Sequence, residues 1–342
     1  MVRLLFIGTF PPPEGGITLL AKLLLNKLQK SEKLEVDVIN ITLLYKGFKF
    51  FFNSVSVLVK LFYKIRMNDL VTFQTSANTF KILGPIVYFI SKLYKKPLIV
   101  RRFAGNGIEL YKSYSRITKY VINKTVFRAD LTYYETSYQV DYFSKFSMQN
   151  VKNMPNHRDL IDSPMLHRNR ASNFVFIGYV CPEKGINEII KSFCRMRKNI
   201  NIDIYGSDGM DIKFKINNFE NIKYMGEFKN QNIYKILSKY DALILPSYWK
   251  GEGHPGVVVE SLITGLPVIA TNLKGISEIV EHNKTGLLIS PKADEELYEA
   301  VTKLNENSEF YLKLKTNIAK TTKKLDAQYW YEEFEKDILS LL

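Results

Sequence analysis

Residues 251 to 269 read Gly251-Glu252-Gly253-His254-Pro255-Gly256-Val257-Val258-Val259-Glu260-Ser261-Leu262-Ile263-Thr264-Gly265-Leu266-Pro267-Val268-Ile269. The pattern predicts a glycine-rich loop, then a helix, then a buried strand. A loop of this kind leaves backbone N–H groups unpaired at the helix start, and such groups bind phosphate or hydroxyl-rich ligands. Glu252 and Glu260, with seven residues between them, bracket the loop and offer acceptors for hydroxyl groups. The stretch therefore indicates a binding site.

This stretch resembles the Glu-x7-Glu motif of retaining glycosyltransferases of family 4. The resemblance continues through Gly265-Leu266-Pro267-Val268-Ile269-Ala270-Thr271 and Gly275-Ile276-Ser277-Glu278-Ile279-Val280. It implies that Glu252 contacts the donor sugar and Glu260 the ribose, with Glu252 in a catalytic role. It also implies the α/β fold called GT-B, in which two doubly wound Rossmann-like domains face one another across a cleft. The loop residues expected to bind the donor are Gly253, His254, Pro255 and Gly256, and for His254 the backbone N–H is favoured over the ring.

Length and composition agree with two packed domains. The chain has 342 residues, of which 46% are hydrophobic, and one core rarely fills so long a chain. The two cysteines, Cys181 and Cys194, are too few for a disulfide framework and lack metal-ligand spacing, which favours a cytoplasmic protein. The first apolar run stops at Pro11 and is too short for a signal peptide, so it is expected to be a buried strand.

Short apolar runs alternate with helical stretches along the chain, which predicts parallel sheets wrapped by helices. The pattern restarts after a polar segment near residues 155–173. We therefore expect a first domain at 1–155, on the acceptor side, and a donor-binding domain at 156–327. The resemblance implies that the last helix, 328–342, packs back on the first domain; an ordinary terminal helix on its own domain is the alternative. Predicted strands cover 3–8, 36–41, 70–73, 97–100, 131–134, 174–177, 200–205, 222–224, 242–245, 268–270 and 286–289.

The formal net charge of +14 is confined to one half of the chain. Through Pro155 there are 23 Lys and Arg against 9 Asp and Glu, and beyond it 25 against 25. The first domain is therefore expected to face an anionic partner, with phospholipid headgroups, a lipid-linked diphosphate and nucleic acid as candidates. Residues 43–64 and 86–96 mix lysines with aromatic and aliphatic side chains, a pattern that suits an anionic membrane surface. A core helix with a solvated lysine face is the alternative.

Lys184 is the second candidate catalytic residue. It lies in Gly178-Tyr179-Val180-Cys181-Pro182-Glu183-Lys184-Gly185, between a predicted strand and a predicted helix. A lysine there can neutralise a donor diphosphate as the leaving group gains charge; a solvated surface lysine is the alternative. The family has an arginine where this chain has Tyr179. Either Arg101, Arg102 or Lys250 supplies the missing cation, or the diphosphate is bound more weakly.

Two loops of the first domain carry further candidates. Gly15 and Gly16 follow the first strand and can adopt positive φ and admit a ligand close to the backbone; the resemblance implies that they face the donor phosphates. Arg102 and Asn106 follow the predicted strand 97–100 and are candidates for acceptor or phosphate contacts, with a structural salt bridge as the alternative for Arg102. Glu278 either approaches the donor or caps its own helix.

The sequence thus predicts transfer of a hexosyl unit, with retention, from a nucleotide diphosphate sugar to a hydroxyl of a lipid-linked saccharide. The expected setting is bacterial surface polysaccharide synthesis at the inner face of the cell membrane. The chain contains no Asp-x-Asp pair, so no metal site and no cofactor are expected, and nucleic acid is not an expected partner. A nucleotide-sugar epimerase of the same fold, a glycosidase with paired carboxylates and a basic nucleic-acid-binding module are the alternatives.

Overall fold

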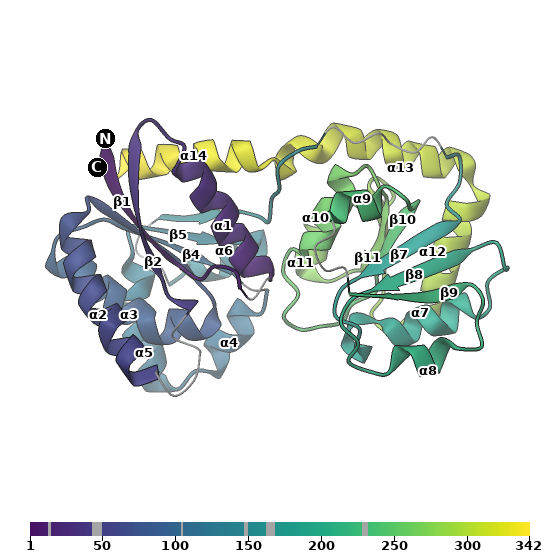
Figure 1. Cartoon of the computed structure of the whole chain (residues 1–342), viewed down its shortest axis with the longest axis horizontal. Helices are drawn as coiled ribbons and strands as arrows, with labels where there is room; N and C mark the ends of the chain where they lie inside the picture. Colours follow the sequence, from purple (N-terminus) through teal and green to yellow (C-terminus); the bar gives the residue numbers. More distant parts are fainter. Residues whose placement is uncertain (13–14, 43–49, 104, 147–149, 162–167, 228–231) are drawn as a thin grey trace. The chain divides into compact units, whose positions relative to one another are not determined.

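The computed structural model describes residues 1–12, 15–42, 50–103, 105–146, 150–161, 168–227 and 232–342. The chain divides into two compact units (Figure 1). The first unit contains Met1–His157 and Ala327–Leu342, and the second contains Arg158–Asp326. These boundaries lie close to the expected ones at 155 and 327.

The first unit is built on a parallel six-stranded sheet of order β2-β1-β3-β4-β5-β6. Every residue of β3, β4 and β5 is buried, because helices cover both faces of a parallel sheet. The sixth strand was not predicted: it has one apolar residue, Val151, and forms the edge of the sheet. The strands are β1 Val2–Gly8, β2 Leu34–Asn40, β3 Leu70–Thr75, β4 Leu98–Arg102, β5 Leu131–Tyr134 and β6 Asn150–Asn153.

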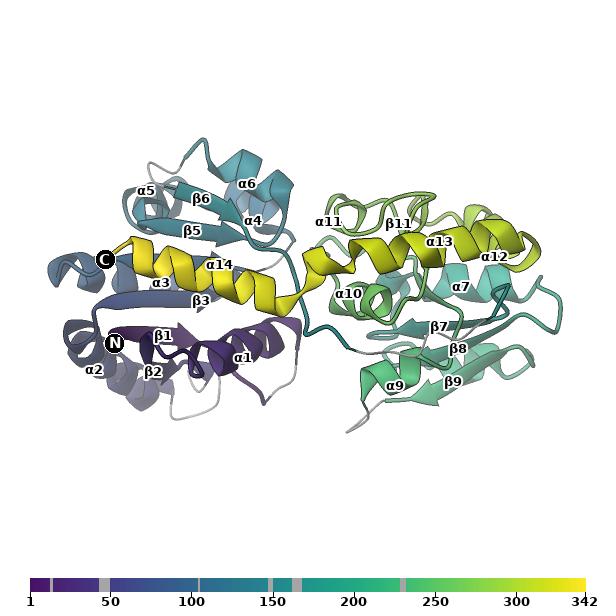
Figure 2. The ribbon, with the colours of Figure 1, turned by 90° about the horizontal axis from the view of Figure 1, so that it is seen from above.

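Two separate hydrophobic layers cover this sheet. On one face α1 and α14 pack against β1 and β5, and on the other face α2, α3 and α5 pack against β1, β3 and β4 (Figures 1 and 2). Among the described helices, none combines the length and the apolar character needed to cross a bilayer. The helices are α1 Gly16–Leu28, α2 Phe50–Met67, α3 Ala77–Leu93, α4 Gly107–Ser113, α5 Arg116–Lys124, η2 Val126–Arg128, α6 Ser137–Phe143 and α14 Ala327–Ser340.

The C-terminal helix α14 belongs to the first unit. Phe334 and Ile338 are fully buried, and the ring of Phe334 lies 5.3 Å from that of Tyr133 on β5. Asp337 accepts hydrogen bonds from Nζ of Lys152 at 2.6 Å and from the hydroxyl of Tyr133. Burial and the charge of Asp337 raise the pKa of Tyr133 above its ordinary value. Apolar burial and a charged hydrogen bond together hold the end of the chain on the first sheet.

The second unit has a parallel sheet of order β12-β11-β10-β7-β8-β9. The chain winds outward from β7 to β9, returns to β10 and winds to the other edge, so the direction of winding changes between β7 and β10. The strands are β7 Asn173–Ile177, β8 Asn201–Tyr205, β9 Ile222–Gly226, β10 Ala242–Leu245, β11 Val268–Thr271 and β12 Gly286–Ile289. The helices are η3 Pro182–Lys184, α7 Ile186–Phe193, α8 Ile212–Ile216, α9 Ile233–Leu237, α10 Gly256–Ile263, α11 Lys274–Ser277, α12 Asp294–Glu306, α13 Ser308–Thr321 and η4 Thr322–Leu325. Two doubly wound α/β units are confirmed.

Candidate functional site

The candidate site lies where the winding of the second sheet reverses. The loop after β7 and the loop after β10 leave the carboxyl ends of adjacent strands, which is where doubly wound sheets bind ligands. Gly185 has φ of +81°, and a Cβ there would come within 2.3 Å of the carbonyl oxygen of Pro246. The N–H of Tyr248 donates to the carbonyl of Glu183 at 2.8 Å. Glycine at residue 185 therefore allows the two loops to lie against each other.

This contact brings Lys184 and Glu252 together. Nζ of Lys184 donates to both carboxylate oxygens of Glu252, at 2.6 and 2.9 Å. The lysine side chain is 19% exposed and the glutamate side chain 10%, so the pair is largely desolvated but still reachable from solvent. Partial burial strengthens the attraction between the two charges. The two residues expected to be catalytic thus form an ion pair, although 68 positions separate them.

We predict that a side chain at residue 185 destabilises the second unit, because it would collide with the loop after β10. Gly226 has φ of +80° and no described atom within 4 Å of its Cβ position, whereas Gly185 shares the conformation and is crowded. Gly226→Ala is expected to destabilise the second unit by about 1–2 kcal/mol, the price of a left-handed backbone alone. Gly185→Ala should cost about 1–3 kcal/mol more from overpacking. Hydrogen exchange of second-unit peptides against urea measures both, and equal losses would contradict the packing of the loop on Pro246.

Glu260 lies on α10 and forms a second ion pair. Nε of Arg158 donates to Oε1 of Glu260 at 2.8 Å, and their side chains are only 7% and 8% exposed. Tyr234 lies nearby, and burial with the charge of Glu260 raises the pKa of its phenol to about 12. Arg158 was not anticipated from the sequence, because it comes 102 positions before Glu260 and no local pattern links the two. The expected contact of Glu260 with a ribose stays a prediction.

The rest of the glycine-rich loop is held by the loop after β11. The ring of His254 is buried, with Nε2 3.2 Å from Oε2 of Glu278. A Cβ on Gly275 would lie 2.2 Å from the carbonyl oxygen of Gly253, so glycine permits this close approach. The imidazole faces the protein, and the loop ends at Pro255, the N-cap of α10. Donor binding by the backbone of Gly253, His254, Pro255 and Gly256 stays a prediction. Glu278 orients the loop through His254.

Tyr179 occupies the position of the family arginine. Its side chain is exposed and lies over Gly209, where a Cβ would meet the phenol oxygen at 2.3 Å. Of the expected substitutes, Arg101 and Arg102 are buried within the first unit, whereas Lys250 is exposed on the loop after β10. Lys250 is therefore the candidate cation that lies in the same unit as the Lys184–Glu252 pair and on the same loop as Glu252.

Gly15 and Gly16 do not use positive φ. Gly15 is extended, with φ of −169°, and Gly16 begins α1. Any residue adopts these conformations, since the chain enters the helix without a left-handed turn. The N–H of Gly15 donates to Oγ1 of Thr18 at 3.0 Å, and no described atom lies within 4 Å of a Cβ on Gly16. The protein itself makes no steric demand for glycine at Gly16, and the expected phosphate contact stays a prediction.

Arg102 is packed inside the first unit rather than presented on a loop. Its guanidinium carbon lies 4.3 Å from the ring centre of Phe80 and 5.2 Å from that of Phe143. Nη2 donates to the carbonyl of Gly107 at 3.2 Å. These contacts support the start of α4, whose N-cap is the half-buried Asn106. The burial of Arg102 favours a structural role for its side chain. A ligand contact by Arg102 or Asn106 stays a prediction.

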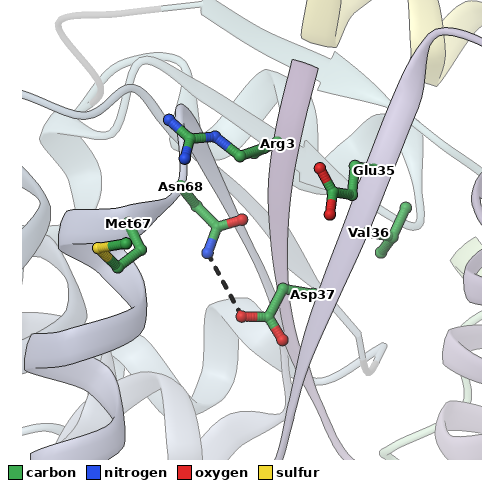
Figure 3. A pocket seen from close by; sticks show the side chains of 6 residues that line it. All are labelled: Arg3, Glu35, Val36, Asp37, Met67 and Asn68. Carbon is green, nitrogen blue, oxygen red and sulfur yellow. Dashed lines mark hydrogen bonds between the residues drawn. The ribbon is translucent and has the colours of Figure 1, made fainter. Parts of the chain in front are cut away.

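A pocket of about 270 Å³ lies at the amino-terminal edge of the first sheet (Figure 3). Three of its polar side chains are already paired: Arg3 contacts Asp69 at 3.2 Å, and Asn68 donates to Asp37 at 3.5 Å. Parallel sheets bind ligands at the opposite, carboxyl-terminal edge. This pocket is therefore not a candidate for the substrate site. Within the described residues no group of three or more His, Cys, Asp and Glu side chains is placed to hold a metal; metal independence stays a prediction.

Comparison with known proteins shows a similarity to glycosyltransferases. Residues 158–322 match the family described as glycosyl transferases group 1. An uncharacterised glycosyltransferase of Methanocaldococcus jannaschii is 27% identical over 169 residues, covering 48% of this chain and 47% of that protein. The capsular polysaccharide biosynthesis glycosyltransferase CapM of Staphylococcus aureus is 24% identical over 206 residues, covering 56% of this chain and 50% of CapM. The chain spans only 32% to 50% of the length of the first curated relatives that it matches.

Solved structures extend the comparison to both units. The crystal structure of Anabaena HepE in complex with UDP superposes with a TM-score of 0.77 at 17% identity, covering 99% of this chain and 100% of HepE. At this identity the likeness concerns the fold, and the GT-B architecture expected from the sequence is confirmed. Together the matches show a GT-B fold and a similarity of the second unit to glycosyl transferases group 1. The narrower assignment to retaining family 4 stays a prediction.

Proposed function

We propose that this protein is a retaining glycosyltransferase that moves a hexosyl unit from a nucleotide diphosphate sugar to an acceptor hydroxyl. The observation that carries the proposal is the Lys184–Glu252 pair at the carboxyl edge of the second sheet. The pair lies within the stretch that matches glycosyl transferases group 1. It places a cation and a carboxylate side by side, which suits a ligand that is both anionic and rich in hydroxyl groups.

In the proposed reaction the bond between the anomeric carbon and the donor phosphate oxygen breaks, and its electron pair stays on the phosphate. The ammonium of Lys184 stabilises this growing charge. Glu252 holds the ammonium in place and accepts hydrogen bonds from sugar hydroxyls. The departing phosphate oxygen takes the proton of the acceptor hydroxyl, whose oxygen bonds to the anomeric carbon on the same face. Glu260, fixed by Arg158, accepts from the ribose.

Nucleotide binding gives the most direct test. HepE has been crystallised with UDP and with UDP-glucose, which supports a nucleotide sugar as donor and leaves uridine and guanosine both open here. At a hundredfold excess over Kd, the true donor is expected to raise the melting temperature by about 5–10 °C. A thermal-shift panel of uridine and guanosine diphosphate sugars measures this, with nucleoside monophosphates and free sugars as controls. A flat response to all diphosphate sugars contradicts the proposal.

Separate activity and binding assays distinguish the alternatives. Conversion of the bound sugar to an epimer without any acceptor would support an epimerase, and cleavage of a simple glycoside would support a glycosidase. Salt-dependent binding of arbitrary DNA, with no response to nucleotide sugars, would support a nucleic-acid-binding module. For a transferase, the anomeric configuration of the product, read by NMR, decides between retention and inversion, and activity in the presence of a chelator tests metal independence.

We further propose a lipid-linked saccharide as the acceptor, at the inner face of a bacterial membrane. The excess of Lys and Arg in the first domain supports an anionic partner. The name of CapM, a protein of capsular polysaccharide biosynthesis, supports surface polysaccharide assembly as the setting. Transfer of labelled sugar to a polyprenyl-diphosphate-linked saccharide, compared with transfer to the same saccharide without its lipid, tests the acceptor class.

A further inference from the structure

Three helices share one side of the first unit. The helix α3 packs against both α2 and α5, and Figures 1 and 2 show all three on the same side of the sheet. Their inner residues, including Leu61, Phe80 and Ile122, belong to the core beneath the sheet. The outer sides of the three helices therefore point away from the core together and form what we term the α2–α3–α5 face.

Apolar side chains are exposed on each of these helices at helical spacing. Val59 on α2 is 63% exposed, Ile82 on α3 65% and Ile117 on α5 77%. Isolated exposed apolar residues are normal, but stripes on three neighbouring helices indicate a surface that meets another apolar phase. The exposed apolar residues of the face are Val55, Val59, Phe62, Tyr63 and Met67 on α2, Ile82, Phe89 and Leu93 on α3, and Ile117, Tyr120 and Val121 on α5.

A groove of about 460 Å³ opens on this face. Aliphatic and aromatic side chains of α2, among them Val59 and Phe62, line it together with Tyr94, which follows α3. Arg66 is the one charged residue among those that line the groove. The groove offers an apolar recess beside a cation, a combination that complements an acyl chain and its phosphate headgroup.

The charge of the face is mainly positive, although Lys64 pairs with Asp37 on β2 and Lys92 with Asp130, which precedes β5. The sequences of α2, α3 and α5 contain eight Lys and Arg and no Asp or Glu. Several ammonium groups lie over tyrosine rings, with Lys81 5.6 Å from the ring centre of Tyr114 and Lys124 6.0 Å from that of Tyr120. Tyrosine and lysine side chains combine an apolar body with a polar tip and favour the boundary between lipid and water.

We propose that the α2–α3–α5 face docks on an anionic lipid bilayer. The apolar stripes enter the boundary between headgroups and acyl chains, and the lysines and arginines meet lipid phosphates. A nucleic acid would complement the charge but leave the exposed Val, Ile and Phe side chains in water. A second copy would bring one excess of positive charge against another. The anionic bilayer satisfies both the charge and the apolar surface.

This inference deepens the proposed function by giving the first domain a membrane-facing surface. It rests on the proposed function in one respect, since a lipid-linked acceptor is the reason for the protein to bind a membrane. Docking needs no donor sugar and no residue of the Lys184 loop. Vesicle binding can therefore fail while transferase activity stands, and the reverse holds as well.

Co-sedimentation with vesicles tests the proposal on the full chain. We expect binding to vesicles of phosphatidylcholine and phosphatidylglycerol in equal parts, weaker binding at high salt, and little binding to phosphatidylcholine alone. The triple variant Val59→Ser, Ile82→Ser, Ile117→Ser should lose affinity by about tenfold or more. Its matched control, Met225→Ser, Phe214→Ser, Leu312→Ser, removes exposed apolar side chains of the second unit and should bind as wild type does.

A second pair of variants isolates the charge. Lys60→Gln, Arg116→Gln, Lys124→Gln removes three exposed cations from the face, and Lys213→Gln, Lys215→Gln, Lys320→Gln removes three from the second unit. Both lower the net charge equally, so only the first should lose about tenfold or more in affinity for the anionic vesicles. Unchanged melting temperatures show that every variant is folded. Equal binding to neutral and anionic vesicles, equal losses in either pair, or tight binding of DNA without binding of vesicles each overturn the proposal.

Discussion

Replacing Lys184 with alanine is expected to lower kcat by about a hundredfold to a thousandfold, the usual effect of removing one group that stabilises charge in a transition state. Glu252→Gln should cause a loss of similar size, because it removes the carboxylate that holds the ammonium at 2.6 and 2.9 Å. Initial rates with the donor identified by thermal shift measure both. The double variant should be little worse than either single variant, since residues that act as a unit are not additive.

Lys191→Ala serves as the control for this prediction. Lys191 lies on α7, the helix that follows Lys184, and its side chain is 64% exposed. Its removal takes away the same charge from the same unit without touching the loops after β7 and β10. Turnover that survives in the Lys184 and Glu252 variants, or that falls as far in the Lys191 variant, would remove the basis of the proposed mechanism.

Arg158→Met is expected to destabilise the second unit by about 3–5 kcal/mol, because it leaves the buried carboxylate of Glu260 without the guanidinium that pairs with it. Hydrogen exchange of peptides from each unit against urea locates the loss in the second unit. Adding Glu260→Gln to Arg158→Met should restore much of the stability, since the neutral amide costs less to bury than a charge. The double variant should nevertheless stay poor in donor binding if Glu260 contacts the ribose.

Arg195→Met is the matched control for stability. Arg195 pairs with Glu295 at 2.6 Å, but both side chains are largely exposed, and exposed pairs contribute little. The change should therefore have a small effect by the same measurement. A loss as large as that of Arg158→Met would show that burial does not decide the strength of the two pairs.

Local patterns in the sequence were enough to predict the two doubly wound units. Apolar runs such as Phe174–Ile177 identify strands because a parallel strand covered on both faces tolerates few polar residues. The edge strand β6 has one apolar residue in Asn150–Asn153 and carries no such signal. The loops that hold Lys184 and Glu252 were found for a related reason: glycine and proline mark where a strand ends and a helix begins.

Which side chains meet was decided by the tertiary structure. The pairing of Lys184 with Glu252 requires β7 and β10 to be neighbours in the sheet, and the pairing of Arg158 with Glu260 joins residues 102 positions apart. The joining of α5 to α2 and α3 into one basic, apolar face is equally non-local. Periodicity and turn residues depend on whether each segment faces solvent or core, so the sequence determined the helices, the strands and the loops that join them. Contacts between distant segments depend on strand order and packing, which no local pattern records.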